Sequence, residues 1–128
     1  MASILSIHAL FGERILPVLI VVAAIWFAVT WKPSQPVPAA GRFFPILVDL
    51  QATLGLIYFI YGVAVGLPFL GFPFLLHPVL GLLSAGVAHM AVRPRGPFSG
   101  LGRWSALAAL GVLLILVIGA TMLAKTAA

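Results

Sequence analysis

Charged residues are scarce in this chain, and cysteine is absent. Only 7% of its 128 residues are charged, whereas a typical soluble domain has about 25%, so a water-soluble fold is excluded. The lack of cysteine excludes disulfides, iron–sulfur clusters and thiolate zinc sites in any compartment. The sequence also has neither a nucleophile–base–acid set nor a phosphate-binding loop, and we therefore expect no enzymatic activity.

Four apolar runs occupy most of the sequence, at residues 15–31, 43–66, 74–92 and 104–124. Hydrophobic residues make up 63% of the chain, and its mean hydropathy is +1.25. Each run has, or nearly has, the ~20 helical residues that cross a hydrocarbon layer. A helix also satisfies its own backbone hydrogen bonds in lipid. The sequence predicts one all-α domain, residues 1–128, that forms an up-down-up-down four-helix bundle in the membrane.

Basic residues predict the orientation of this bundle. Five of the seven lysines and arginines flank the first and third loops: Lys32, Arg42, Arg93, Arg95 and Arg103. By the positive-inside rule these loops are cytoplasmic and both termini lie outside. The net charge of +5 then reflects contact with membrane lipids, and we expect no nucleic-acid partner.

Small and aromatic residues predict contacts of the second run. Gly62 and Gly66 form a small-xxx-small pair, with Gly55 seven residues earlier, and this pattern allows close approach of helices in lipid. Phe44 is expected to anchor the cytoplasmic boundary. The uncharged loop 67–73 is expected to lie at the headgroup boundary or against another protein. Other membrane subunits or further copies of the chain are the expected partners.

Two histidines distinguish the third run. His77 and His89 are separated by the small residues Gly81 and Ala85, all at four-residue spacing. Histidine is the usual axial ligand of b-type haem, and small residues let a flat macrocycle approach a helix. Pro78 suits the first turn of a helix, which predicts that this helix begins beside His77. The alternative is that either histidine is only an interfacial or structural residue.

The other runs supply partners for these histidines. His8 is expected in the outer leaflet with His77, on a segment that prolongs the first helix. Asp49 and Gln51 lie near the cytoplasmic start of the second run, at a depth comparable to that of His89. Because an unpaired carboxylate within the membrane is costly, we expect Asp49 and His89 to lie within one hydrogen bond or one bridging water.

This arrangement resembles a group of small bacterial four-helix membrane proteins loosely described as cytochrome b-like. They carry a histidine early in the first helix, an H-x-Q-x-x-x-G-like entry to the second and a third helix with a histidine near each end. The matching positions here are His8, Asp49, Gln51, Gly55, His77 and His89. The resemblance implies the bacterial inner membrane and a role in electron transfer. Asp49 stands where these proteins tend to place a histidine, so it implies a haem between His8 and His77 rather than one at His89.

We therefore expect a membrane subunit associated with electron transfer that binds one haem b or contacts quinone. The candidate cofactor ligands are His8, His77 and His89, with Asp49 and Gln51 as further site residues. One alternative is a non-catalytic subunit of a large respiratory or photosynthetic complex. A second is a small proton-coupled transporter that uses Asp49. Glu13 is expected to pair with the adjacent Arg14 at the outer surface rather than to serve transport.

Overall fold

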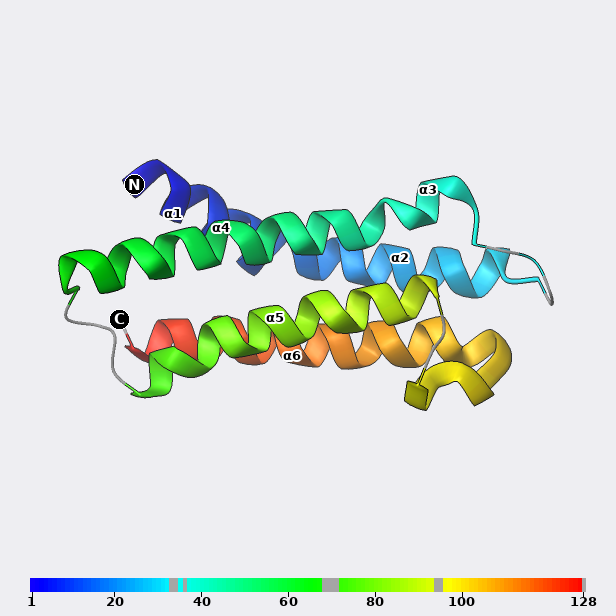
Figure 1. The fold of residues 1–128 in the computed structure, drawn as a ribbon. Helices are drawn as coiled ribbons and strands as arrows, with labels where there is room; N and C mark the ends of the chain where they lie inside the picture. The colour runs from blue at the N-terminus through cyan, green and yellow to red at the C-terminus, as the bar shows by residue number, and fades with distance from the viewer. Residues whose placement is uncertain (33–34, 36, 68–71, 94–95, 128) are drawn as a thin grey trace.

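The computed structural model describes residues 1–32, 35, 37–67, 72–93 and 96–127 of the chain (Figure 1). Nearly all of these residues are helical, and no strand occurs within these ranges. Four segments are long and apolar enough to cross a membrane: Ala2–Thr30, Phe44–Val65, Phe74–Val92 and Gly96–Thr126. The predicted all-α four-helix membrane bundle is confirmed.

The helical segments are longer at some ends than the apolar runs. In chain order the elements are α1 (Ala2–Leu10), the π-helical turn η1 (Phe11–Ile15), α2 (Leu16–Thr30), α3 (Ala39–Arg42), α4 (Phe44–Val65), α5 (Phe72–Val92), the 3₁₀-helical η2 (Gly96–Trp104) and α6 (Ser105–Ala127). The first segment begins at Ala2 rather than near residue 15. Residues 2–11 contain neither glycine nor proline, so nothing in them interrupts a helix.

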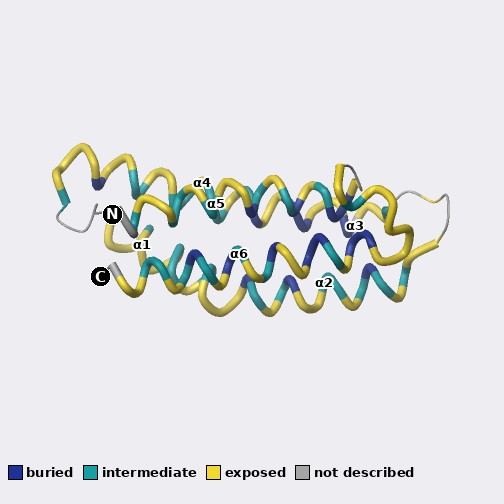
Figure 2. The backbone as a smooth tube through the Cα atoms, turned by 90° about the horizontal axis from the view of Figure 1, so that it is seen from below, coloured by how far each residue is buried: buried dark blue, intermediate teal, exposed yellow. Residues whose placement is uncertain are grey.

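The helices pack in a definite order around the bundle. α5 and α6 lie along each other, with α4 against α5 and α2 against α6 (Figures 1 and 2). The first segment contacts α4 through α1. Both termini lie at one end of the bundle, and α3 and η2 lie at the other (Figure 1). This arrangement places α1 where it can form a wall between α4 and the end of α6.

Most of the buried residues lie in the half of the bundle nearer α3 and η2 (Figure 2). The residues that are at most 2% exposed include Val48, Ala88, Ala109, Leu110 and Leu113. Alanines at the contact of α5 with α6 let the two backbones approach closely, as is typical of helix pairs in lipid. The tight core therefore occupies one half of the molecule and leaves the other half free to enclose a site.

Basic residues share the end of the bundle that carries α3 and η2. Lys32 follows α2, Arg42 ends α3, Arg93 follows α5 and Arg103 lies in η2. Arg95 lies outside the described residues. Phe44 differs from its expected role as a boundary anchor, because it faces the core and is only 8% exposed.

Two further expectations about the backbone are corrected. Gly66 does not pack a helix face: it has a φ of 68° and ends α4 in the left-handed conformation, with the Leu67 amide donating to the Gly62 carbonyl. Pro78 is not in the first turn of its helix, because α5 begins at Phe72 and continues past it. Of the apolar loop 67–73, residues 68–71 lie outside the described part of the chain.

Candidate functional site

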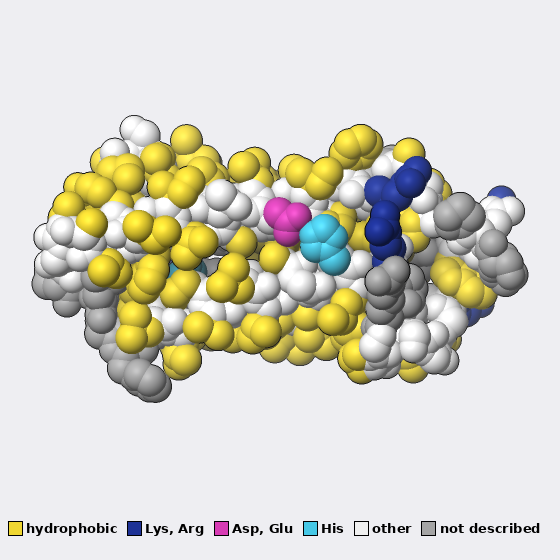
Figure 3. Space-filling view, viewed as in Figure 1, with side chains coloured by type: hydrophobic (Ala, Val, Ile, Leu, Met, Phe, Trp, Pro, Cys, Tyr) yellow, Lys and Arg dark blue, Asp and Glu magenta, His cyan; other side chains and the backbone are white. Residues whose placement is uncertain are grey.

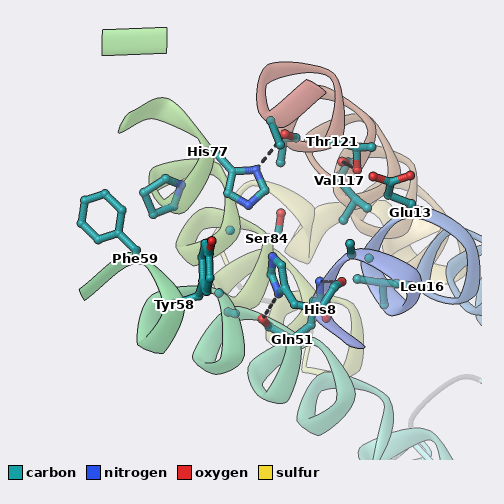
Figure 4. A pocket seen from close by; sticks show the side chains of 18 of the residues that line it. His8, Glu13, Leu16, Gln51, Tyr58, Phe59, His77, Ser84, Val117 and Thr121 are labelled. Carbon is teal, nitrogen blue, oxygen red and sulfur yellow. Dashed lines mark hydrogen bonds between the residues drawn. The ribbon is translucent and has the colours of Figure 1, made fainter. Parts of the chain in front are cut away.

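A cavity of about 360 Å³ lies between the helical segments, in the half of the bundle that carries the termini. Figure 4 shows side chains that line it. Its volume lies in the range of small-molecule and cofactor sites. Most of its lining is apolar. The polar side chains that line it are those of His8, Glu13, Gln51, Tyr58, His77, Ser84, Thr121 and Lys125. The cavity therefore combines apolar walls with a few polar groups, two of which are imidazoles.

The His8 imidazole is held against α4 by two hydrogen bonds and a glycine. Its Nδ1 donates to the Gln51 carbonyl at 3.1 Å, and the Gln51 side-chain Nε2 donates to the His8 carbonyl at 2.8 Å. A Cβ atom on Gly55 would lie only 2.6 Å from the His8 ring, so this glycine makes the space that the ring occupies. A Cβ on Gly12 would meet the Gln51 amide in the same way. The two glycines explain how the helical segment formed by α1 and η1 approaches α4 so closely.

The His77 imidazole is held from the opposite side of the cavity. Its Nδ1 donates to the Ala120 carbonyl of α6 at 2.8 Å. The Phe74 ring stacks on it from one turn earlier in α5, with ring centroids 5.8 Å apart and an interplanar angle of 17°. Each histidine is thus oriented by a backbone carbonyl of a neighbouring helix.

His8 and His77 meet inside the cavity, which confirms the predicted proximity of the two residues. Their ring centroids are 5.8 Å apart and their planes are inclined by 81°. Figure 4 shows the rings turned toward each other, with the hydrogen-bonded nitrogen of each on its far side. Because a carbonyl can only accept, Nδ1 carries the proton in each neutral ring and Nε2 keeps its lone pair. A carbonyl bond at one ring nitrogen is the usual arrangement for a histidine whose other nitrogen binds a metal.

Further hydrogen-bonding capacity in the cavity lies close to these rings. The side-chain Oε1 of Gln51 is buried and has no hydrogen-bond partner among the described residues. The hydroxyls of Ser84 and Thr121 each donate to the carbonyl four residues earlier, at 2.7 and 3.0 Å, and keep lone pairs as acceptors. The site therefore offers mainly acceptors to anything that it binds.

An ion pair lies where the cavity approaches the chain termini. Lys125 of α6 lies 3.0 Å from Glu13 of η1, and both side chains line the cavity. The predicted pairing of Glu13 with Arg14 is wrong, because consecutive helical residues point in different directions whereas α6 passes directly beside η1. η1 is a π-helical turn, a feature often found at functional sites.

Asp49 and His89 form a second polar site, separate from the cavity. The Asp49 Oδ2 and His89 Nε2 atoms are 2.9 Å apart, which confirms the predicted pairing. Neither residue lines the cavity. Of the candidate residues, the structure thus brings together His8, His77 and Gln51, and it places His89 with Asp49 on the outer surface.

Several functional groups of the cavity could not be found from sequence patterns. The Ala120 carbonyl is a backbone atom with no sequence signal, and the contact of Glu13 with Lys125 joins residues more than a hundred positions apart. The sequence predicts Gly55 as a helix-packing residue and as part of the pattern that enters the second run, and neither prediction links it to His8. Its place four residues after Gln51, on the same helix face, is the signal that could have linked it to His8.

The donor set also bears on which metals this site could hold. Among the described residues, no group of three or more His, Cys, Asp or Glu side chains could hold a metal ion. Two histidines alone suit a metal whose other ligands come from a macrocycle. No family model matches this sequence, and no curated protein or solved structure matches it either.

Proposed function

We propose that this chain is a small membrane subunit associated with electron transfer, and that it binds one b-type haem between His8 and His77. The observation that carries the proposal is the pair of facing imidazoles, each with its Nδ1 bonded to a backbone carbonyl. We place the chain in the bacterial cytoplasmic membrane. The basic end of the bundle, which carries α3 and η2, lies in the cytoplasm, and both termini lie outside, as the positive-inside rule favours.

The geometry of the two rings fits a bis-histidine site. Two metal–imidazole bonds of ~2 Å in line put the ring centroids about 6 Å apart, and the observed separation is 5.8 Å. The apolar lining suits a flat apolar macrocycle, and helical-bundle interiors commonly hold such groups. Gly81 lines the same cavity, and a Cβ atom added there would meet nothing within 4 Å, so the wall beside His77 has room.

The residues of the chain have distinct tasks in this site. His8 and His77 would hold the haem iron, while Gln51 and the Ala120 carbonyl orient their rings. The apolar walls would exclude water from the bound group, and exclusion of solvent is one of the factors that set the reduction potential of a metal site. When bound, a b-type haem supplies one-electron redox chemistry.

A reduced-minus-oxidised absorption spectrum of the purified protein tests this proposal. Protein from haem-sufficient cells should show the Soret and alpha bands of a b-type haem. His8→Ala and His77→Ala should each abolish bis-histidine ligation. His89→Gln is the matched control, because it removes an imidazole outside the cavity and should leave the spectrum unchanged.

Contact with a quinol is a second candidate function, and one observation favours it. The buried Gln51 Oε1 lacks a partner among the described residues, and with the two imidazole Nε2 atoms it forms a set of acceptors that suits the hydroxyl donors of a quinol. Protein that is purified without haem absorbance but carries extractable quinone would contradict the haem proposal and support this one. The transporter alternative has no comparable support, because Asp49 does not line the cavity.

A further inference from the structure

The Asp49–His89 pair lies on the outside of the bundle, although both residues belong to membrane-spanning helices. The side chain of Asp49 is 43% exposed and that of His89 is 59% exposed. In Figure 3 an acidic and a histidine side chain lie side by side, with mostly hydrophobic side chains on one side of them and a column of lysine and arginine side chains on the other. Something other than the rest of this chain must therefore complete the surroundings of the pair.

The depth of the pair makes lipid an unfavourable neighbour. Asp49 is five residues into α4 and His89 is three residues before the end of α5. At a rise of 1.5 Å per residue these positions lie about 8 Å and about 5 Å from the helix ends. Aspartate and histidine are too short to reach the headgroups as lysine and arginine do. Polar groups at such depth are normally turned toward protein or water.

The hydrogen-bonding capacity of the pair is only half used. Asp49 Oδ2 and His89 Nε2 bond each other, while Asp49 Oδ1 and His89 Nδ1 have no partner among the described residues. The net-neutral form of the pair is either aspartate with imidazolium or aspartic acid with neutral imidazole. In that form the shared proton lies between Asp49 and Nε2, and Nδ1 also carries a hydrogen. The pair then presents one free acceptor and one free donor.

We infer that this chain forms a two-fold symmetric dimer through the face of α4 and α5, with a second copy of itself covering the pair. A free donor and a free acceptor on one patch are complementary to the same patch after a two-fold rotation, as an isologous interface requires. His89 Nδ1 of each copy donates to Asp49 Oδ1 of the other. All four side chains then close into one hydrogen-bonded ring, and no donor or acceptor of the pair faces lipid.

The surroundings of the pair suit such an interface. Gly86 lies one turn before His89, and a Cβ atom there would meet nothing within 4 Å, so another helix can approach. Leu82 and Ile46, at the same helix faces, are 57% and 53% exposed. The patch is thus apolar on the side of the pair that faces the middle of the bundle, while exposed Arg93 lies one turn after His89 on the other side. This inference does not depend on whether the cavity binds haem.

Cross-linking in native membranes tests the interface directly. The chain has no cysteine, so Gly86→Cys introduces a single thiol beside the pair, and a short bismaleimide should join two copies. Ile25→Cys, at a 60% exposed position on α2, is the matched control and should give little cross-linked dimer. Equal yields from the two variants, or a Gly86→Cys product with a different polypeptide, would overturn the inference.

A double substitution separates the role of the pair from general apolar association. The mass of the purified wild type in mild detergent should correspond to two copies. Replacing both residues by leucine, Asp49→Leu with His89→Leu, should weaken dimerisation by roughly tenfold, because two interhelical hydrogen bonds are lost. Thermal unfolding of the monomer should not become easier, since leucine suits a lipid-facing surface. A wild type that is monomeric at all concentrations, or a double variant that dimerises equally well, would contradict the dimer. A haem spectrum of the same samples reports on the cavity and not on the dimer.

Discussion

Gln51 and Gly55 show how single residues place His8 within the cavity. Gln51 bonds His8 through both its backbone carbonyl and its side-chain amide. Gly55 lies four residues later on the same helix face and leaves the space that the ring fills. Both residues lie in α4, and their contacts position the histidine of the first helix.

Gly55→Ala is predicted to displace the His8 imidazole. The added Cβ would lie 2.6 Å from the ring, which is closer than real contacts allow, and it abuts the ring itself rather than a flexible chain end. On helix propensity alone, alanine would stabilise α4 by about 1 kcal/mol over glycine. A lower unfolding temperature in detergent, together with loss of haem absorbance, would therefore report the clash with His8.

Gly111→Ala is the matched control for this change. Gly111 lies in α6, and an added Cβ there would meet nothing within 4 Å. This variant should be at least as stable as the wild type and keep the same spectrum. A Gly55→Ala protein that behaves like Gly111→Ala would show that the close packing around His8 does not matter.

At the scale of elements, the π-helical turn η1 sets the rotation of α1 relative to α2. A π turn inserts one extra residue into a helix, so the part of the helix before it is rotated about the axis. The rotation turns His8 and Gly12 toward α4 while Leu16 and Ile20 of α2 remain in the core. The helical segment Ala2–Thr30 therefore packs against α4 through α1 and against α6 through α2.

Deleting Arg14 is predicted to convert η1 into ordinary α-helix. One residue fewer rotates α1 by about 100°, which carries His8 away from Gln51. The loss of the two hydrogen bonds between these residues should cost about 2 kcal/mol of stability. The measurements are the thermal unfolding of the protein and its haem absorbance.

Arg14→Ala serves as the control for the deletion, because it keeps the length of the turn. Arg14 is exposed, so this variant should fold and absorb as the wild type does. If the deletion variant were equally stable and kept its spectrum, η1 would not be needed to position His8.

At the scale of the whole molecule, the basic end and the termini lie at opposite ends of the bundle, and this arrangement makes the orientation testable. Gln35 lies between α2 and α3, and Ser99 lies in η2, both at the basic end. Single cysteines at these exposed positions should be shielded from an impermeant thiol reagent in intact cells. A cysteine at Ser3, near the other end, should be labelled. The reverse pattern would place the His8–His77 cavity in the cytoplasmic leaflet.

The sequence was sufficient to predict the class of fold and which polar groups lie at the same level along the bundle. Apolar run length decides which segments span a membrane, and helical rise decides depth along the axis. These two rules brought His8 to the level of His77 and Asp49 to the level of His89, and both pairs are in contact in the structure. Both rules depend only on the order of residues along one helix.

The direction in which each side chain points was decided only by the tertiary structure. Apolar residues surround each long membrane-spanning helix, so its hydrophobic pattern has no preferred face from which to predict where a side chain points. The structure turns His8 and His77 inward against backbone carbonyls, and it turns Asp49 and His89 outward. It also pairs Glu13 with Lys125 instead of Arg14. The rotation of each helix about its own axis depends on contacts between segments that are distant in the sequence. In this chain those contacts are the glycine-mediated approach of α1 to α4 and the close packing of α5 on α6. A local sequence pattern does not encode these rotations.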